Sequence, residues 1–365
     1  ACDDELVRYL QRARRTPFGP EVIVGYLSAK EVEFTAVRTI LSGKLAGLDA
    51  EDIRARLPLA NDCEITVEGR LTNFDERKME ACLEGGANRF SLGVQSFSTK
   101  IRQAMGRLCP REDLLRRIEK LRSYNQAAIV VDLIYGFPMQ DMESWLDDIA
   151  TAQSIGLDGA DCYQLNTYRG TPLSRAIENG KLPAGADTAG RALMFRAGVE
   201  AMQEGFWRRL SISHWANTTR ERNLYNQYVK GRAHCLAFGP GGGGNIDGTF
   251  YMNQSDIAAW RESVEAGRKP LAMAVLPVPR WKLCKAVTEG MERGALNLSA
   301  LESEFDEPLC DICRPVLEQW ERAGLVTWAG DFLVLTVAGQ FWQVNLNQLL
   351  LDYLKHAPGQ SGRAC

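Results

Sequence analysis

Two apolar stretches of the sequence, NRFSLGVQSF at residues 88–97 and VVDLIYGFP at residues 130–138, decide the fold class. Runs rich in Val, Ile, Leu and Phe predict strands that are buried on both faces, as in a parallel sheet. Each run nevertheless carries a polar side chain, Gln95 in the first and Asp132 in the second. An unpaired polar group in a dry interior costs on the order of 1–3 kcal/mol, so we expect both side chains to face a ligand.

Strand-like and helix-like segments alternate around these two runs up to residue 215. Strands are expected at residues 63–69, 89–97, 128–138, 159–166 and 209–216. Helices are expected between them at residues 75–86, 98–125, 141–156 and 188–206, with a break in the second at Pro110. Repeated strand–helix units imply parallel strands and right-handed crossovers. The predicted fold class is therefore α/β, as a doubly wound sheet or as a full or partial barrel.

Polar side chains lie toward the carboxyl end of successive predicted strands: Glu68, Gln95, Asp132, Asn166 and His214. In barrels of this kind the carboxyl ends of the strands meet at one face, and active sites lie there. Any one of these residues could be structural. Five in consecutive strands favour a polar small-molecule site.

The chain is predicted to have three regions: residues 1–215 as the barrel domain, 216–280 as an extension with a glycine-rich loop, and 281–365 as a C-terminal domain with a tail. The extension contains a predicted helix at 218–231 and the run GPGGGG at 239–244, interpreted as a flexible active-site loop. The last region reads helix, helix, hairpin, helix. This order predicts a winged-helix-like α+β domain.

Composition excludes several classes of partner. A formal net charge of −3 over 365 residues gives no basic surface for nucleic acid. No apolar run reaches the ~20 residues of a membrane span, and no signal peptide precedes the first charges, which predicts a cytoplasmic protein without a membrane partner. Ten scattered cysteines indicate reduced thiols. Cys310 and Cys313 are expected to be a packed thiol pair, because a metal site needs further ligands.

The order of EITVEG (64–69), NRFSLGVQSF, MGR (105–107), VVDLIYGFP, YQLN (163–166) and RGTPL (169–173) resembles the radical S-adenosylmethionine (SAM) enzymes of the oxygen-independent coproporphyrinogen oxidase superfamily. SISHWANTTRERNLYNQ (211–227) and CLAFGPGGGGNIDG (235–248) are most similar to its anaerobic haem-degrading methyltransferases. The resemblance implies a partial (β/α)6-type barrel followed by the winged-helix-like domain.

The resemblance also implies six residues that contact SAM. Glu68 and Arg107 would bind the methionyl end, Gln95 and Asp132 the ribose, and Ile134 and Asn166 would flank the adenine. A carboxylate and a guanidinium suit the amino and carboxylate groups of the methionyl end. An ionised Asp is an obligate acceptor for ribose hydroxyls.

The resemblance implies haem as the substrate. Residues that contact haem are expected near the last predicted strand and near the glycine run. Imidazole is a common haem ligand, and a flat indole ring could lie against a porphyrin. The haem-contacting candidates are His214, Trp215, Arg220 and His234. Cys235, beside His234, is the candidate catalytic residue, as a thiol that donates a hydrogen atom to a radical intermediate.

The resemblance implies a [4Fe-4S] cluster, held in such enzymes by a C-x3-C-x2-C loop, and a reducing electron donor such as a flavodoxin. None of the ten cysteines has this spacing, and VRTILSGKLAGLDAED (37–52) stands where the family carries a GGGTP turn. No metal ligand for the cluster is therefore identified. Either the loop lay upstream of Ala1 or in an omitted stretch, or the protein is a relative without a cluster.

The expected function is radical SAM-dependent, anaerobic degradation of haem, with methyl transfer, porphyrin ring opening and release of iron. One alternative within the same fold is a coproporphyrinogen-oxidase-like enzyme. The alternative from another class is a cluster-less haem carrier or chaperone.

Overall fold

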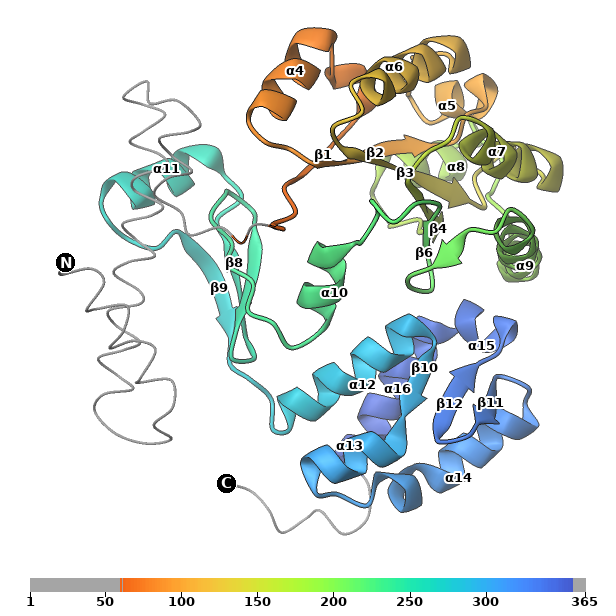
Figure 1. The fold of residues 1–365 in the computed structure, drawn as a ribbon, viewed down its shortest axis with the longest axis vertical. Coiled ribbons are helices and arrows are strands. Elements are labelled where there is room, and N and C mark those ends of the chain that lie inside the picture. The colour runs from red at the N-terminus through yellow and green to blue at the C-terminus, as the bar shows by residue number, and fades with distance from the viewer. Residues whose placement is uncertain (1–59, 61, 357–365) are drawn as a thin grey trace. The chain divides into compact units, whose positions relative to one another are not determined.

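The central feature of the chain is a six-stranded mixed sheet with the strand order β1-β2-β3-β4-β6-β5 (Figure 1). The structure, a computed structural model, describes residue 60 and residues 62–356. The segment 37–52 and the tail after residue 356 lie outside these residues. The strands are β1 (Thr66–Gly69), β2 (Arg89–Gln95), β3 (Ala128–Tyr135), β4 (Gly159–Gln164), β5 (Arg208–Arg209) and β6 (His214–Ala216).

Strands β1 to β4 are parallel, which confirms the α/β prediction. The expectation of a fifth parallel strand at 209–216 is wrong, because this segment folds into the hairpin β5–β6, with β6 antiparallel to β4. The backbone N–H groups of Leu210 and Ser211 both donate to the carbonyl of His214, at 2.8 and 3.3 Å, and close the turn. His214 therefore begins its strand instead of ending it.

Helices cover one face of this sheet. They are α4 (Glu76–Glu84), α5 (Thr99–Ala104), α6 (Arg111–Ser123), α7 (Met142–Ser154), α8 (Pro172–Glu178) and α9 (Thr188–Glu204), with a 3-10 turn, η1 (Leu71–Asn73), after β1. The predicted break at Pro110 is confirmed. Helix α8 was not predicted, although Thr171 accepts from the backbone of Ser174 and Pro172 occupies the first turn, a recognisable start signal.

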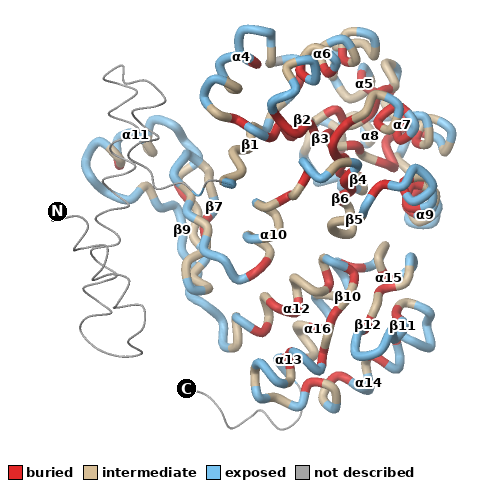
Figure 2. The backbone as a smooth tube through the Cα atoms, viewed as in Figure 1, coloured by how far each residue is buried: buried red, intermediate tan, exposed pale blue. Residues whose placement is uncertain are grey.

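The main core lies between the sheet and these helices (Figure 2). Phe90, Leu92 and Val94 of β2 alternate with residues of the other face and are 0% exposed. Trp145 of α7 is also fully buried and donates from its indole nitrogen to the carbonyl of Met194 in α9 at 2.8 Å. The helix-covered face of the sheet is thus apolar, and the polar residues of the strands point to the opposite face.

The extension forms an antiparallel sheet in the order β7-β8-β9. Its elements are α10 (Leu224–Lys230), β7 (Gly243–Ile246), β8 (Thr249–Asn253), α11 (Ile257–Glu265) and β9 (Leu271–Val275). The interpretation of 239–244 as a flexible loop is wrong for its last two residues, because Gly243 and Gly244 belong to β7. Asp247 and Gly248, with φ of 47° and 80°, make the two-residue turn that pairs β7 with β8.

The C-terminal region has a second hydrophobic core. It contains the predicted helices and hairpin in the expected order, with an unpredicted strand and helix after the first helix and with the last helix divided in two. Its elements are α12 (Trp281–Arg293), β10 (Ala295–Asn297), α13 (Leu298–Phe305), α14 (Leu309–Arg322), β11 (Val326–Ala329), β12 (Phe332–Leu335), α15 (Val337–Phe341) and α16 (Gln343–His356). Cys313 is buried in this core and Cys310 packs against it. Among the described helices, none combines the length and the apolar character needed to cross a bilayer.

Candidate functional site

A cavity of about 230 Å³ lies on the sheet face that the helices leave open. Its walls come from four neighbouring parallel strands and from the first turn of α10. The lining residues are Glu68, Gly69, Arg89, Ser91, Gly93, Asp132, Asp161, Tyr163, Tyr225 and Asn226. Three carboxylates and one guanidinium face this space, so its lining is acidic.

The period of a β-strand explains this set of residues. Arg89, Ser91 and Gly93 alternate along β2 with buried apolar residues, so they share the open face. Strand pairing places Gly93 beside Asp132 and Asp132 beside Asp161. Side chains at paired positions of neighbouring strands point to the same side, so the two carboxylates lie in one row across the sheet.

Gln95 and Asp132, the two polar residues of the apolar runs, both lie over Gly93. A Cβ atom on Gly93 would stand 3.0 Å from Nε2 of Gln95 and 3.8 Å from Oδ2 of Asp132. A bulge between Gly93 and Gln95 and the positive φ of Gln95, 72°, turn the side chain of Gln95 toward this point. Such a backbone is costly for a residue other than glycine and is most often found at functional sites.

Arg107 reaches the same place from beyond α5. Its Nη1 donates to the carbonyl oxygen of Gly93 at 2.7 Å. The structure therefore brings four of the six predicted SAM residues together around Gly93: Glu68, Gln95, Arg107 and Asp132. Of these four, Glu68 and Asp132 line the cavity.

The other two predicted SAM residues belong neither to the lining nor to the group around Gly93. Ile134 is half-buried and packs against the small cluster of Ile101, Phe137 and Leu165. Asn166 is exposed and follows the end of β4. Both stand toward the carboxyl ends of their strands, farther along the sheet than the row of carboxylates.

The carboxylates of the cavity influence one another. Burial raises the pKa of Asp132 to about 6, and the nearby charges of Asp161 and Glu68 add to the effect. Burial also raises the pKa of Tyr163, and Asp161 adds to it. Asp132 is therefore the cavity carboxylate whose charge changes just below neutral pH.

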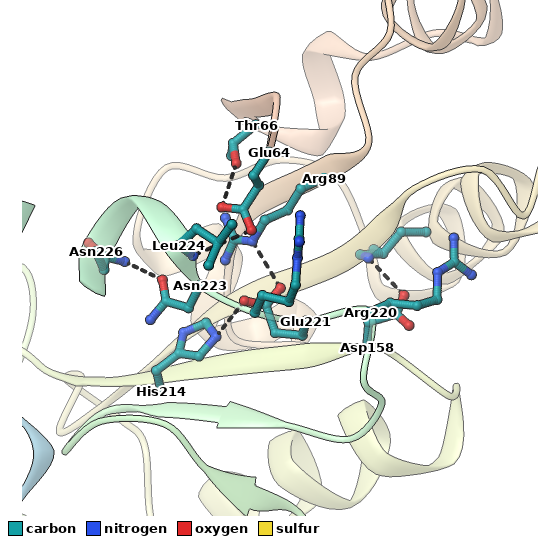
Figure 3. A network of polar contacts seen from close by, with 12 residues as sticks. Glu64, Thr66, Arg89, Asp158, His214, Arg220, Glu221, Asn223, Leu224 and Asn226 are labelled. Atoms are coloured by element: carbon teal, nitrogen blue, oxygen red, sulfur yellow. Dashed lines mark hydrogen bonds and ion pairs between the residues drawn. The ribbon is translucent and has the colours of Figure 1, made fainter. Parts of the chain in front are cut away.

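A buried ion network lies behind the cavity (Figure 3). Nε of Arg89 donates to Glu221 at 2.9 Å, the other oxygen of Glu221 lies 3.1 Å from Nε2 of His214, and Nδ1 of His214 lies 2.7 Å from Asp161. Burial alone would lower the pKa of His214, but the carboxylates of Asp161 and Glu221 outweigh it and raise the pKa to about 9. The imidazole is thus a cation at neutral pH, with a carboxylate oxygen within 3.1 Å of each ring nitrogen.

The prediction that His214 and Trp215 offer their rings to haem is not supported by their positions. His214 is 1% exposed inside the ion network, and Trp215 is 2% exposed in the main core. The guanidinium of Arg209 covers the indole ring at 4.9 Å. The hairpin explains the difference, because it places both side chains within the fold instead of at a strand end.

Arg220, a candidate for contact with a haem propionate, is bound to other parts of the chain instead. Its guanidinium donates to the side chain of Asn125 and to the carbonyl of Ala127, both at 2.8 Å, and so ties the loop after β6 to the start of β3. The predicted helix at 218–231 begins only at Leu224, after Asn223, whose φ of 54° is left-handed and does not continue a helix.

His234 and Cys235 lie at the edge of the extension sheet. His234 is half-exposed, with Nε2 3.0 Å from Asp247. Cys235 pairs with Asn245 of β7. Burial raises the pKa of Tyr225 in the cavity wall, and the nearby Cys235 adds to that effect, so the thiol stands near the cavity.

The residues that the sequence analysis missed are Arg89, Ser91, Asp161, Tyr163, Glu221, Tyr225 and Asn226. The first four sit at alternate positions of strands already predicted. Steps of two back from Gln95 along β2 lead to Ser91 and Arg89, whereas Asp161 and Tyr163 lie on β4, where the same step from Asn166 leads to the opposite face. Glu221 and the α10 residues are joined to the sheet only by the tertiary fold.

The part of the chain that the structure describes contains no group of three or more His, Cys, Asp or Glu side chains arranged to hold a metal ion. The described residues therefore do not fit a [4Fe-4S] cluster. The cavity, by contrast, fits a nucleoside with a cationic group, because it offers carboxylate, amide, guanidinium and phenol groups close together.

Comparison with known proteins assigns the class that this sheet and site define. A family model for the radical SAM superfamily matches residues 4–152. The described part of the match carries β1 to β3 and Asp132.

The relatives then define the family more closely. Over 308 residues the chain is 42% identical to anaerobilin synthase of Escherichia coli O157:H7, covering 83% of this chain and 67% of that protein. The chain belongs to the radical SAM superfamily and, within it, to the family of anaerobilin synthase.

Coproporphyrinogen oxidases are more distant relatives. The oxygen-independent coproporphyrinogen III oxidase of Cereibacter sphaeroides is 28% identical over 247 residues, which are 64% of this chain and 53% of that enzyme. The chain thus spans about half the length of this relative. The solved coproporphyrinogen III oxidase of Escherichia coli has the same fold, with a TM-score of 0.70 over 82% of this chain and 72% of that one, at 17% identity.

Proposed function

We propose that this chain degrades haem anaerobically as a radical SAM enzyme, by methyl transfer, opening of the porphyrin ring and release of iron. The observation that carries this proposal is the 42% identity to anaerobilin synthase over 83% of the chain. The acidic cavity supports it, because Glu68 and Asp132 line it and Gln95 and Arg107 contact its Gly93.

In this proposal six residues, two in the cavity lining and four outside it, divide the binding of SAM among them. Glu68 and Arg107 hold the methionyl end. Asp132 and Gln95 form hydrogen bonds with the ribose hydroxyls, with Asp132 as the acceptor. Ile134 and Asn166 border the adenine. SAM, when bound, supplies an activated sulfonium carbon. The sheet beneath it excludes water, which strengthens each charge contact.

Asp132 predicts how SAM affinity depends on pH. A carboxyl whose pKa is about 6 is ionised above that pH and neutral below it. Since a cationic ligand favours the ionised form, affinity should be constant above about pH 7 and fall by up to about tenfold per unit below pH 6. Calorimetric titration with SAM at several pH values measures this.

Asp132→Asn should weaken SAM binding about tenfold at neutral pH and abolish the fall at low pH. The matched control is Asp147→Asn. Asp147 lies on α7, and its half-exposed carboxylate is paired with Arg111 of α6. If SAM affinity still falls below pH 6 in Asp132→Asn, the pH dependence belongs to another titratable group.

The extension sheet supplies an apolar surface of the kind that a porphyrin face needs. Phe250 and Val275 are paired across β8 and β9, as are Met252 and Met273. Phe250, Met273 and Val275 are 40%, 45% and 47% exposed. Paired side chains share a face, so these form one partly exposed apolar surface, here called the extension face. We assign the flat macrocycle of haem to it.

Cys235 belongs to the extension face as well, through the pairing of Cys235 with Asn245 and of Asn245 with Phe250. Haem on this face would lie next to the thiol and near Tyr225 in the cavity wall. We keep Cys235 as the proposed hydrogen-atom donor and the half-exposed His234 as the proposed haem contact. An electron donor such as a flavodoxin completes the proposal.

Phe250→Ala is expected to weaken haem binding by about 5- to 20-fold, because it removes an aromatic side chain from the extension face. Titration of the chain with haem, followed at the Soret band, measures the change. The control is Phe206→Ala, since Phe206 is 93% exposed and follows α9, outside the extension. Equal haem affinities in the two variants would show that haem does not bind to the extension face.

Activity is tested by incubating the chain anaerobically with iron, sulfide, haem, SAM and a reductant. Loss of the Soret band together with formation of 5′-deoxyadenosine and a methylated, ring-opened product supports the proposal. Tight haem binding with an unchanged Soret band would indicate a carrier instead. Decarboxylation of coproporphyrinogen without loss of haem would favour the coproporphyrinogen oxidase alternative.

A further inference from the structure

Glu221 lies behind the cavity without lining it. Its side chain is 0% exposed and comes from the loop between β6 and α10. One carboxylate oxygen accepts from Nε of Arg89 at 2.9 Å, and the other lies 3.1 Å from Nε2 of His214 (Figure 3). Burial would raise the pKa of Glu221, but the hydrogen bonds from His214 and Arg89 outweigh it and lower the pKa. Glu221 is therefore an ionised group held in one orientation.

Both partners of Glu221 lead to the cavity. Arg89 lines it directly. His214 reaches it through Asp161, whose Oδ2 lies 2.7 Å from Nδ1 of the imidazole. Glu221 thus faces, from behind, the two cations that stand beneath the carboxylates of the cavity.

The charge of Arg89 matters because it stands among acidic side chains. A guanidinium with no other anion would pair with Asp132 or Asp161 and occupy the carboxylates that a cationic ligand needs. Glu221 supplies the anion that is hydrogen-bonded to Arg89, and the charge of Glu64 adds to its effect. Glu221 holds Arg89 toward the rear of the network and offsets the positive charge that the cavity would otherwise contain.

We propose that Glu221 is a positioning residue that determines the charge specificity of the cavity, since by holding Arg89 and His214 it leaves the cavity carboxylates to the sulfonium of SAM in preference to a neutral thioether. The inference rests on the proposed function, which supplies SAM as the ligand. Glu221 itself touches no ligand in this scheme and acts through its two partners.

Glu221→Gln separates charge from shape. The amide has nearly the volume of the carboxylate, its oxygen accepts from Arg89, and its NH₂ group donates to a neutral His214. Arg89 loses its hydrogen-bonded counter-ion, while the charge of Glu64 remains near it. The pKa of His214 should fall because one of the two carboxylates that raise it is gone. The other charged groups around His214 are Asp161 of β4, Asp132 of β3 and Arg89 of β2, and all three remain.

The test measures the dissociation constants of SAM and S-adenosylhomocysteine by calorimetry at about pH 6.5 to 7, with the purified chain prepared anaerobically with iron and sulfide. Glu221→Gln is expected to lower the preference for SAM about five- to tenfold, mainly through weaker SAM binding, and to leave haem affinity unchanged. Glu221→Asp keeps the charge and should keep the preference. The control is Glu292→Gln, which alters a Glu paired with Lys230, outside the cavity lining.

A second readout follows the charge directly. The chain has three histidines, so the imidazole signals in an NMR titration can be assigned with His234→Gln and His356→Gln. The midpoint of His214, expected near its pKa of about 9, should move down in Glu221→Gln and stay in place in Glu292→Gln. A purely structural role for Glu221 would not couple this midpoint to the SAM preference.

An unchanged ratio of SAM to S-adenosylhomocysteine affinity in a folded Glu221→Gln chain, or an unmoved His214 midpoint, would overturn the inference and leave the proposed function intact. Should Glu221→Gln not fold, loss of the preference in Glu221→Asp would overturn it. A wild-type chain that binds neither nucleotide would overturn the proposed function and, with it, this assignment.

Discussion

Replacing Glu221 with alanine is expected to lower the free energy of unfolding by about 3–5 kcal/mol. The carboxylate is 0% exposed and serves two cations at once, Arg89 and His214. Alanine leaves the guanidinium buried without its partner. The cost comes from that uncompensated charge in a medium of low dielectric more than from the lost contact itself.

Urea denaturation followed by circular dichroism measures this effect. Glu318→Ala is the matched control, because it removes the same group from an exposed pair with Arg322, and it should change the free energy of unfolding by at most about 0.5 kcal/mol. Equal losses in the two variants would mean that the buried network does not stabilise the sheet.

Trp145→Ala is expected to cost about 3–5 kcal/mol of stability. The indole fills the core between α7 and α9, and a Cβ on Gly198 of α9 would come within 3.0 Å of it. Its ring lies 5.4 Å from that of Tyr135, at the end of the strand that carries Asp132. Its removal leaves a large cavity and takes away the indole donor to the carbonyl of Met194.

Trp328→Ala, on the exposed side of β11, provides the comparison and should cost less than about 1 kcal/mol. The free energies of unfolding come from the same denaturation experiment. Because α7 packs behind β3, Trp145→Ala should also weaken SAM binding, whereas Trp328→Ala should not. A stable Trp145→Ala chain would show that the core repacks around the missing ring.

Local patterns predicted most of the central sheet and of the helices that cover it. The apolar runs at β2 and β3, the amphipathic stretches of α4, α6, α7 and α9, and the break at Pro110 all depend on neighbouring residues, and the structure contains each of them. The predictions were wrong where a distant contact decides the outcome. Residues 209–216 read as one strand, yet the turn before His214 folds them back along β4.

The candidate site was predictable to the extent that its residues break an apolar pattern. Gln95 and Asp132 stood out in this way, and the structure places both beside Gly93. Arg89 and Asp161 did not stand out, because a charged residue near the start of a strand or beside polar neighbours looks ordinary. The interaction of Arg89 with Glu221 joins residues 132 positions apart, and no local pattern encodes it.

The sequence by itself determined the α/β class, the winged-helix-like order and the polar residues in apolar strands, since strand and helix periods and polarity are local properties of a chain. The tertiary structure alone decided that β6 runs antiparallel, that His214 and Trp215 are buried, and that Glu221 stands behind Arg89. These depend on which strands pair and on which distant charges share a dry interior, where an ion is stable only beside its partner.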